Sequence, residues 1–211
     1  MRGTVKVASL ATAKQTKRRF DAVLTIEDPG MRHGLRFHSF PHPEQLVLMF
    51  EDVDDPSPEI ALPHESHVEA ALSFGREHER GSMLVHCRAG VARSAGLALG
   101  IIADRLGPGR EREAVAALLK DRPAARPNLI VLRMADVLLG REGRLFDAWM
   151  EVESSHPSFA QHRELKRQTL AQQPWLYAAP RPLASTAWRI PSGTLRPVPL
   201  FEPGSGAPVP A

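Results

Sequence analysis

Near the middle of the chain, residues 83–94 read Met83-Leu84-Val85-His86-Cys87-Arg88-Ala89-Gly90-Val91-Ala92-Arg93-Ser94. The apolar run before His86 is typical of a buried strand, and the small and apolar residues 95–103 are typical of a buried helix. A short loop lies between them, and its backbone N–H groups can curl toward one point. The helix beginning near Ala92 adds its unpaired N–H groups and the positive end of its dipole at the same place. These residues therefore predict an anion-binding loop between a strand and a helix.

Cys87 stands at the base of this loop. Backbone N–H groups and the nearby Arg93 favour the thiolate over the thiol, and a thiolate at neutral pH is a nucleophile. A lone cysteine after an apolar strand is more often an inert buried thiol. A cysteine and an arginine at this spacing, between a strand and a helix, favour a phosphate or similar oxyanion site instead. Gly90 suits a loop position that needs a positive φ or a close approach to the anion.

The pattern resembles the phosphate-binding loop of the cysteine-dependent protein tyrosine phosphatases, especially their small dual-specificity-like branch. His86-Cys87 is followed by five residues, of which Gly90 is the third, and then by Arg93-Ser94. The segment from Pro127 to Arg144 also resembles small bacterial members of that superfamily. Rhodanese-type sulfurtransferases and arsenate reductases use a cysteine-headed anion loop too, but they explain Gly90 with Arg93-Ser94 less well.

The resemblance implies a role for each residue of the loop. Cys87 would attack phosphorus and form a phosphocysteine, and Arg93 would hold two phosphoryl oxygens in a planar fork that lysine cannot reproduce. Ser94 would hydrogen-bond the thiolate and ease its departure, while His86 would orient the loop from behind. The substrate-binding residues would be Arg88, Ala89, Gly90, Val91, Ala92 and Arg93. No cofactor and no metal ion are expected.

A general acid is also needed, because the departing oxygen develops negative charge. The family carries this aspartate after the strand that precedes the helix leading to the cysteine strand. Three aspartates follow the apolar run there, namely Asp52, Asp54 and Asp55. Alignment of the preceding strand favours Asp52 as the acid, whereas counting back from Cys87 favours Asp55, which is the second choice.

Periodicity predicts an α/β fold with a central mixed, largely parallel sheet flanked by helices, and with the phosphate-binding loop between the central strand and a buried helix. Strands are expected over residues 5–10, 20–26, 35–40, 45–50 and 83–85, and helices over 63–79, 92–106, 110–121 and 129–139, with a short helix through 145–149. Residues 1–150 would form the catalytic domain. Residues 151–211 would be a polar and Pro-rich extension, with a polar helix over 161–172 and largely disordered after residue 172, so that truncation there should leave stability unchanged.

Composition sets limits on function. With 27 basic and 24 acidic residues among 211, the net charge of +3 suits an anionic substrate but is too even to argue for nucleic acid. No apolar run is long enough for a membrane span, and the single cysteine excludes an intramolecular disulfide, so a reducing, cytoplasmic setting is expected. His64 and His67 share a predicted helix face, but no Cys/His framework for a metal accompanies them.

These observations predict a phosphomonoester hydrolase that acts through a phosphocysteine, most simply a protein tyrosine or dual-specificity phosphatase with a phosphorylated protein as substrate. Two other functions remain open. The first is a non-catalytic phosphate-binding module, and the second is a rhodanese-like sulfurtransferase. The Pro-rich tail is either dispensable or a docking peptide for a partner protein.

Overall fold

A six-stranded sheet crosses the molecule in the order β1-β4-β2-β3-β5-β6, in a computed structural model that describes residues 3–29, 42–183, 186–190 and 196–197. The first four strands in that order are parallel to their neighbours, namely β1 (Val5–Ser9), β4 (Met83–Cys87), β2 (Ala22–Glu27) and β3 (Gln45–Met49). At one edge, β5 (Ala187–Ile190) and β6 (Arg196–Pro197) run antiparallel. The predicted mixed, largely parallel sheet is therefore confirmed, and the strand that carries Cys87 lies inside it.

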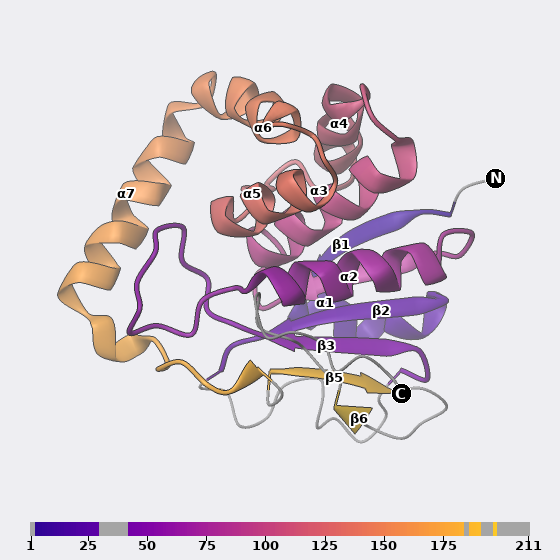
Figure 1. Cartoon of the computed structure of the whole chain (residues 1–211), viewed down its shortest axis with the longest axis horizontal. Coiled ribbons are helices and arrows are strands. Elements are labelled where there is room, and N and C mark those ends of the chain that lie inside the picture. The colour runs from indigo at the N-terminus through magenta and orange to yellow at the C-terminus, as the bar shows by residue number, and fades with distance from the viewer. Residues whose placement is uncertain (1–2, 30–41, 184–185, 191–195, 198–211) are drawn as a thin grey trace, which may run out of the picture.

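Most of the described helices gather over one face of this sheet (Figure 1). They are α2 (Glu65–Glu77), α3 (Arg93–Leu106), α4 (Glu111–Asp121), α5 (Leu129–Leu138) and α6 (Arg144–Ser154). On the other face, α1 (Leu10–Thr16) and the 3-10 turn η1 (Lys17–Arg19) follow β1. The chain then runs through α7 (Pro157–Gln172) at the left of Figure 1 and a second 3-10 turn, η3 (Pro174–Leu176).

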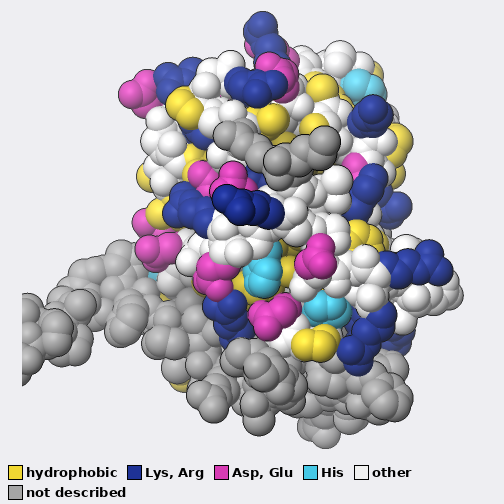
Figure 2. All heavy atoms as spheres, turned by 90° about the vertical axis from the view of Figure 1, so that its right-hand side faces the viewer, with side chains coloured by type: hydrophobic (Ala, Val, Ile, Leu, Met, Phe, Trp, Pro, Cys, Tyr) yellow, Lys and Arg dark blue, Asp and Glu magenta, His cyan; other side chains and the backbone are white. Residues whose placement is uncertain are grey.

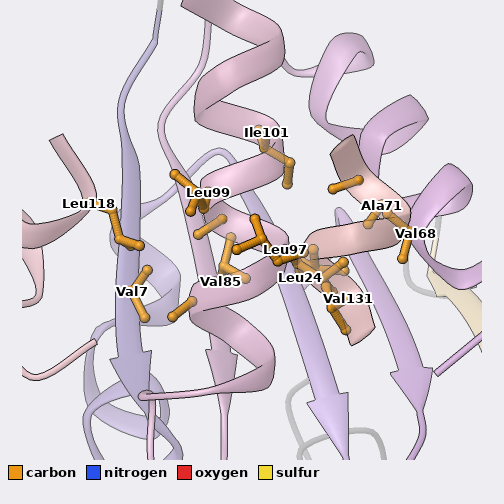
Figure 3. Packing of buried hydrophobic residues seen from close by; sticks show 14 of the residues in the cluster. Val7, Leu24, Val68, Ala71, Val85, Leu97, Leu99, Ile101, Leu118 and Val131 are labelled. Carbon is orange, nitrogen blue, oxygen red and sulfur yellow. The ribbon is translucent and has the colours of Figure 1, made fainter. Parts of the chain in front are cut away.

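The core follows from the alternation of side chains along the strands. Leu24 and Val85 face the large helical layer, whereas their neighbours Val23 and Leu84 face α1, because successive side chains of a strand point to opposite faces. Figure 3 shows Leu97 of α3 directed into the layer between these strands and the neighbouring helices. Helix α3 is apolar on almost every side because the sheet, α2, α4 and α5 all surround it.

The helix boundaries confirm most of the sequence predictions. Asn128 caps α5 as its type and position indicate, because its side chain accepts a hydrogen bond of 3.1 Å from the backbone N–H of Val131. Helix α3 ends at Leu106, directly before Gly107-Pro108. The strand predicted over residues 35–40 lies outside the described residues.

The C-terminal extension departs from the prediction. Helix α7 begins earlier than expected, at Pro157. After residue 172, where disorder was predicted, Ala187–Ile190 form β5 against β3, and the N–H of Met49 donates to the carbonyl of Thr186 at 2.8 Å. The composition did not indicate this pairing because the ladder is made by the backbone and needs little apolar side-chain area. The division into a domain over 1–150 and an extension over 151–211 stays a prediction.

Charges of both signs are interspersed over the end of the molecule away from α7, as Figure 2 shows. This agrees with the near balance of basic and acidic residues in the sequence. Among the described residues, no helix combines the length and the apolar character needed to cross a membrane.

Candidate active site

The loop from Arg88 to Ala92 holds its carbonyl groups outward. The N–H of Leu10 donates to the carbonyl of Arg88 at 3.1 Å, and the backbone N–H groups of Arg126 and Asn128 donate to the carbonyls of Val91 and Ala92 at 2.8 and 3.1 Å. The guanidinium of Arg122 donates to the carbonyls of Ala89 and Gly90 at 3.1 and 2.9 Å. In a trans peptide, each carbonyl points opposite to the next N–H. The N–H groups that follow these carbonyls are therefore turned toward the inside of the loop.

Gly90 is required at its position for two reasons. Its φ is +67°, in the left-handed region that residues with a side chain rarely adopt. A Cβ atom there would also lie 2.3–2.5 Å from backbone atoms of Ala8 and Ser9. The loop is thus pressed against the end of β1, which explains the glycine that the sequence pattern singled out.

Cys87 ends β4 at the base of the loop and is 3% exposed. Its Sγ accepts a hydrogen bond of 3.3 Å from the N–H of Gly90 and lies 3.1 Å from Oγ of Ser94, in the first turn of α3. Both groups can donate a hydrogen bond to the sulfur atom. Sequence spacing predicted this meeting of Cys87 and Ser94, and the structure brings them together.

Arg93 is buried at the start of α3, where two acceptors fix its guanidinium. Nη1 donates to the carbonyl of Phe50 at 2.8 Å, and Nη2 lies 2.5 Å from a carboxylate oxygen of Asp28. The Nε atom is buried and has no hydrogen-bond partner among the described residues. A buried donor of this kind is costly unless a ligand completes it, so the geometry is suited to an oxyanion bound in the loop.

His86 supports the loop from behind β4. Gln45 donates to Oγ1 of Thr25 at 2.7 Å, and Oγ1 lies 2.8 Å from Nε2 of His86. Thr25 thus links the side-chain amide of Gln45 to the ring of His86. Burial lowers the pKa of His86 to about 4, which agrees with a neutral ring. The arrangement is compatible with the predicted orienting role.

The three aspartates after β3 have different surroundings. Asp52 lines the same pocket as Cys87 and Arg93. Asp54 is 5% exposed and accepts a hydrogen bond of 3.0 Å from the N–H of Leu129, at the start of α5, which is a structural contact. Asp55 is half-exposed, pairs with Arg167 at 3.2 Å, and does not line that pocket. The position of Asp52 thus fits the first choice for the acid better than that of Asp55.

Asp52 lies among cations. Its Oδ1 accepts from Asn128 at 3.1 Å and lies 3.0 Å from Nζ of Lys166. Burial raises the pKa of this carboxyl, but the charges of Lys166 and Arg93 and these hydrogen bonds outweigh burial and leave the pKa below its usual value. Beside it, burial raises the pKa of Glu51, because only the N–H of Ala178 and the charge of Arg93 oppose the loss of water.

The pocket has a volume of about 530 Å³ and is lined at its base by Cys87 and Arg93, with Arg88 and Ala89 of the loop beside them. Its other walls include Asp28 and Glu51 and, from the C-terminal extension, His162, Lys166, Leu176 and Tyr177. Gly90, Val91 and Ala92 belong to the loop but do not line the pocket. The sequence analysis missed the extension as a pocket wall, because nothing in its composition marks a helix that returns to the site.

Two more contributors were missed, Asp28 and Arg122. Asp28 directly follows β2, and nothing in its sequence context gave reason to expect it as a partner for Arg93. The histidines weighed as metal ligands serve another purpose, because His64 and His67 form capping hydrogen bonds at the start of α2.

Comparisons with known proteins bear on this arrangement. No protein-family model matches the sequence. The MAP kinase phosphatase with leucine-rich repeats protein 2 of Dictyostelium discoideum is 34% identical over 109 residues, which are 49% of this chain and only 15% of that protein. Among solved structures, human DUSP28 has a TM-score of 0.45 at 19% identity and covers 64% of this chain and 93% of its own. Tk-PTP has a TM-score of 0.48 at 21% identity and covers 66% of this chain and 93% of its own.

The match to the Dictyostelium protein confirms the resemblance to the cysteine-dependent protein tyrosine phosphatases that was drawn from residues 86–94. The finer prediction of a small bacterial branch stays a prediction. In sequence, this chain is similar to the cysteine-dependent protein tyrosine phosphatase superfamily.

Proposed function

We propose that the chain is a phosphomonoester hydrolase that acts through a phosphocysteine, as a protein tyrosine or dual-specificity phosphatase. One observation carries the proposal: Sγ of Cys87 accepts from the N–H of Gly90 and lies 3.1 Å from the hydroxyl of Ser94, while the unpartnered Nε of Arg93 is buried beside the same pocket. A nucleophile, a set of anion donors and a fixed guanidinium are the parts that phosphoryl transfer needs.

In the first step, the thiolate of Cys87 attacks phosphorus and the bond from phosphorus to the leaving oxygen breaks. The N–H groups of the loop and Arg93 stabilise the equatorial oxygens of the transferring group. Asp52 gives its proton to the leaving oxygen, which departs as an alcohol or phenol. The dianionic phosphoryl group offsets the positive field of Arg93, so substrate binding raises the pKa of Asp52 toward the protonated form that this step uses.

In the second step, the carboxylate of Asp52 takes a proton from water, and the water oxygen forms a bond to phosphorus. The bond between phosphorus and sulfur breaks, and the hydroxyl of Ser94 donates to the thiolate as it leaves. Inorganic phosphate is the product. Cys87 returns to its starting state, so no cofactor and no metal ion enter the scheme.

A phosphorylated protein is the proposed substrate. Leu176 is 60% exposed and lines the pocket with Tyr177, so one wall presents apolar surface to a substrate side chain. An aromatic ring would bury more apolar area there than the stem of phosphoserine, which supports phosphotyrosine as one substrate. A nucleophilic cysteine must remain reduced, which supports a cytoplasmic setting. The Pro-rich tail as a docking peptide remains a separate proposal.

Hydrolysis of p-nitrophenyl phosphate, with orthovanadate as inhibitor, tests the proposal. We expect the wild-type protein to turn over and Cys87→Ser to keep phosphopeptide binding without turnover, because a hydroxyl is not ionised at neutral pH while Arg93 and the loop remain. Turnover by Cys87→Ser would reject the mechanism. Phosphopeptide binding without wild-type turnover would favour the non-catalytic module, and thiosulfate with cyanide as substrates tests the sulfurtransferase.

A further inference from the structure

The acidic loop after β3 is held mainly by the C-terminal extension. Arg163, Lys166 and Arg167 lie three and four residues apart, on one face of α7. Arg163 lies 3.1 Å from Asp54, Lys166 lies 2.7 Å from Asp54 and 3.0 Å from Asp52, and Arg167 lies 3.2 Å from Asp55. Beyond α7, the N–H of Ala178 donates to Glu51 at 3.0 Å. The extension thus contacts four acidic residues of this loop, namely Glu51, Asp52, Asp54 and Asp55.

Helix α7 is itself anchored to the body of the molecule. The ring of Phe159 stacks on that of Trp149, with centroids 6.0 Å apart and planes at 9°. Arg163 pairs with Glu153 of α6 and donates to the carbonyl of Pro127 at 3.2 Å. These contacts are buried, so they fix the helix more firmly than exposed ion pairs would. Lys166, one turn further along, is therefore presented to Asp52 from a fixed support.

Lys166 contacts two carboxylates with different environments. Asp54 is fixed by its hydrogen bond to the start of α5, whereas the side chain of Asp52 is 33% exposed and faces the pocket. The side chain of Lys166 is 17% exposed, and its ammonium group joins the fixed carboxylate to the one beside the nucleophile. Asn128 gives Asp52 a second hydrogen bond, from the other side of the loop.

We propose that α7 completes the active site and that Lys166 is a positioning residue, which holds Asp52 in the orientation needed for proton transfer to the leaving group. The proposal rests on the hydrolase function proposed above. It makes the extension a working part of the site, because general acid catalysis depends on a carboxyl held within hydrogen-bond reach of the departing oxygen.

The charge of Lys166 gives a second readout besides orientation. The groups that act on Asp52 are Arg93 from α3, Lys166 and His162 from α7, Asn128 before α5, Tyr177 after η3, and Glu51 on its own loop. Burial raises the pKa of Asp52, and Lys166 is the strongest opposing group. Removing the lysine charge should raise that pKa. Because Asp52 acts protonated, the alkaline limb of the kcat/KM profile should then move to higher pH.

Two substrates separate positioning from general damage. Phenyl phosphate has a poor leaving group that needs a proton, whereas 2,4-dinitrophenyl phosphate has one that departs without it. In Lys166→Met we expect kcat for phenyl phosphate to fall about 10–100-fold, a part of the roughly 10²–10⁴-fold that general acid catalysis supplies. The rate for the dinitrophenyl ester should stay within about 3-fold, and the alkaline limb should move upward.

Two control variants complete the test. Lys166→Arg keeps the charge and should restore most of the rate and the position of the limb. Arg167→Met removes the neighbouring cation, whose partner Asp55 does not line the pocket, and should leave both substrates unchanged. An equal loss for both esters, an unchanged phenyl phosphate rate or an unmoved limb in Lys166→Met would overturn the proposal. If the wild type hydrolyses neither ester, the hydrolase function fails and this inference fails with it.

Discussion

Arg93 acts through geometry as much as through charge. Its guanidinium donates to the carbonyl of Phe50 and pairs with Asp28, while Nε has no partner among the described residues and can bind a ligand. One rigid planar group therefore makes contacts in three directions. A lysine offers one point charge on a flexible stem. We therefore expect Arg93→Lys to lower kcat on p-nitrophenyl phosphate roughly 10²–10³-fold, the loss typical of removing an oxyanion donor. Arg105→Lys, on the same helix but outside the pocket, is the control, and a wild-type rate in Arg93→Lys would remove the proposed role.

The choice among Asp52, Asp54 and Asp55 can be settled by leaving-group dependence. We expect the Asn variant of Asp52 to lose roughly 10²–10⁴ in kcat on phenyl phosphate and far less on esters with good leaving groups. Asp55→Asn should change kcat little for any leaving group, because Asp55 and its partner Arg167 both lie outside the pocket. Asp54→Asn should lose stability instead, since it weakens one buried ion pair, one partly buried ion pair and a helix-end contact. A flat dependence for Asp52→Asn would reject the assignment.

Residues close together in sequence were the predictable part of the candidate site. Cys87, Gly90 and Ser94 lie within one strand, loop and helix, so their spacing alone brings them together. Asp28 and Lys166 meet this loop only through the folded chain, and a single sequence holds no record of such contacts. The residue types of Asp28 and Lys166 give no indication of these contacts either, because an aspartate after a strand and a lysine on a polar helix are ordinary surface residues.

At the level of the loop as an element, Gly90 offers a clean test of shape. Gly90→Ala places a Cβ against fixed backbone of β1 and keeps a positive φ. Gly140→Ala is a matched control, because Gly140 also has a positive φ, of +61°, and nothing lies within 4 Å of its added Cβ. We expect Gly90→Ala to lose roughly 2–4 kcal/mol of unfolding free energy and most vanadate affinity, against about 1 kcal/mol and unchanged affinity for Gly140→Ala. Equal effects of Gly90→Ala and Gly140→Ala in urea unfolding and in vanadate titration would show that only the positive φ, and not the contact with β1, determines the loss.

Elements with a strong period were predictable, and those made by backbone pairing alone were not. Helices α2, α4 and α5 carry apolar stripes and α3 is apolar nearly all round, and the helix ends have clear signals such as Asn128 and Gly107. Strand β5 has four residues, including Arg189, and lies in a segment rich in proline. Its partner strand β3 supplies the stability, since an unpaired sheet edge favours any compatible backbone. That information belongs to the tertiary structure.

Across the whole molecule, two buried histidines should make stability depend on pH. Burial, helped for His67 by the charge of His64, lowers the pKa of His67 to about 3, and burial lowers that of His86 to about 4, from 6.5. The unfolded chain binds these protons below pH 6.5 and the folded chain does not, so stability is present above pH 6.5 and is lost as pH falls toward the folded pKa values. By linkage, each histidine should lower the free energy of unfolding by about 2 kcal/mol between pH 7 and pH 5. Urea unfolding at both pH values measures the loss, and His67→Gln should reduce it by about half.

The same histidine connects the helical layer to the C-terminal extension, which determines how truncation should act. Nε2 of His67 lies 2.8 Å from Oγ1 of Thr186, whose hydroxyl donates to the carbonyl of Leu183 at 2.7 Å. Truncation after Gln172 would remove this contact, the ladder from β5 to β3 and the N–H of Ala178 that binds Glu51. Composition alone predicted no effect, because little apolar area is lost.

The contacts predict a different result for that truncation. The edge of β3 would lose its backbone partners, and buried His67 and Glu51 would each lose a hydrogen bond, which costs about 1–3 kcal/mol per buried polar group. We expect the melting temperature to fall by roughly 5 °C or more, given about 2–4 °C per kcal/mol for a chain of this size. A second truncation after Pro197 keeps every described contact, so the difference between the two variants isolates residues 173–197. Equal melting temperatures for both variants would return the extension to the dispensable role that its composition suggests.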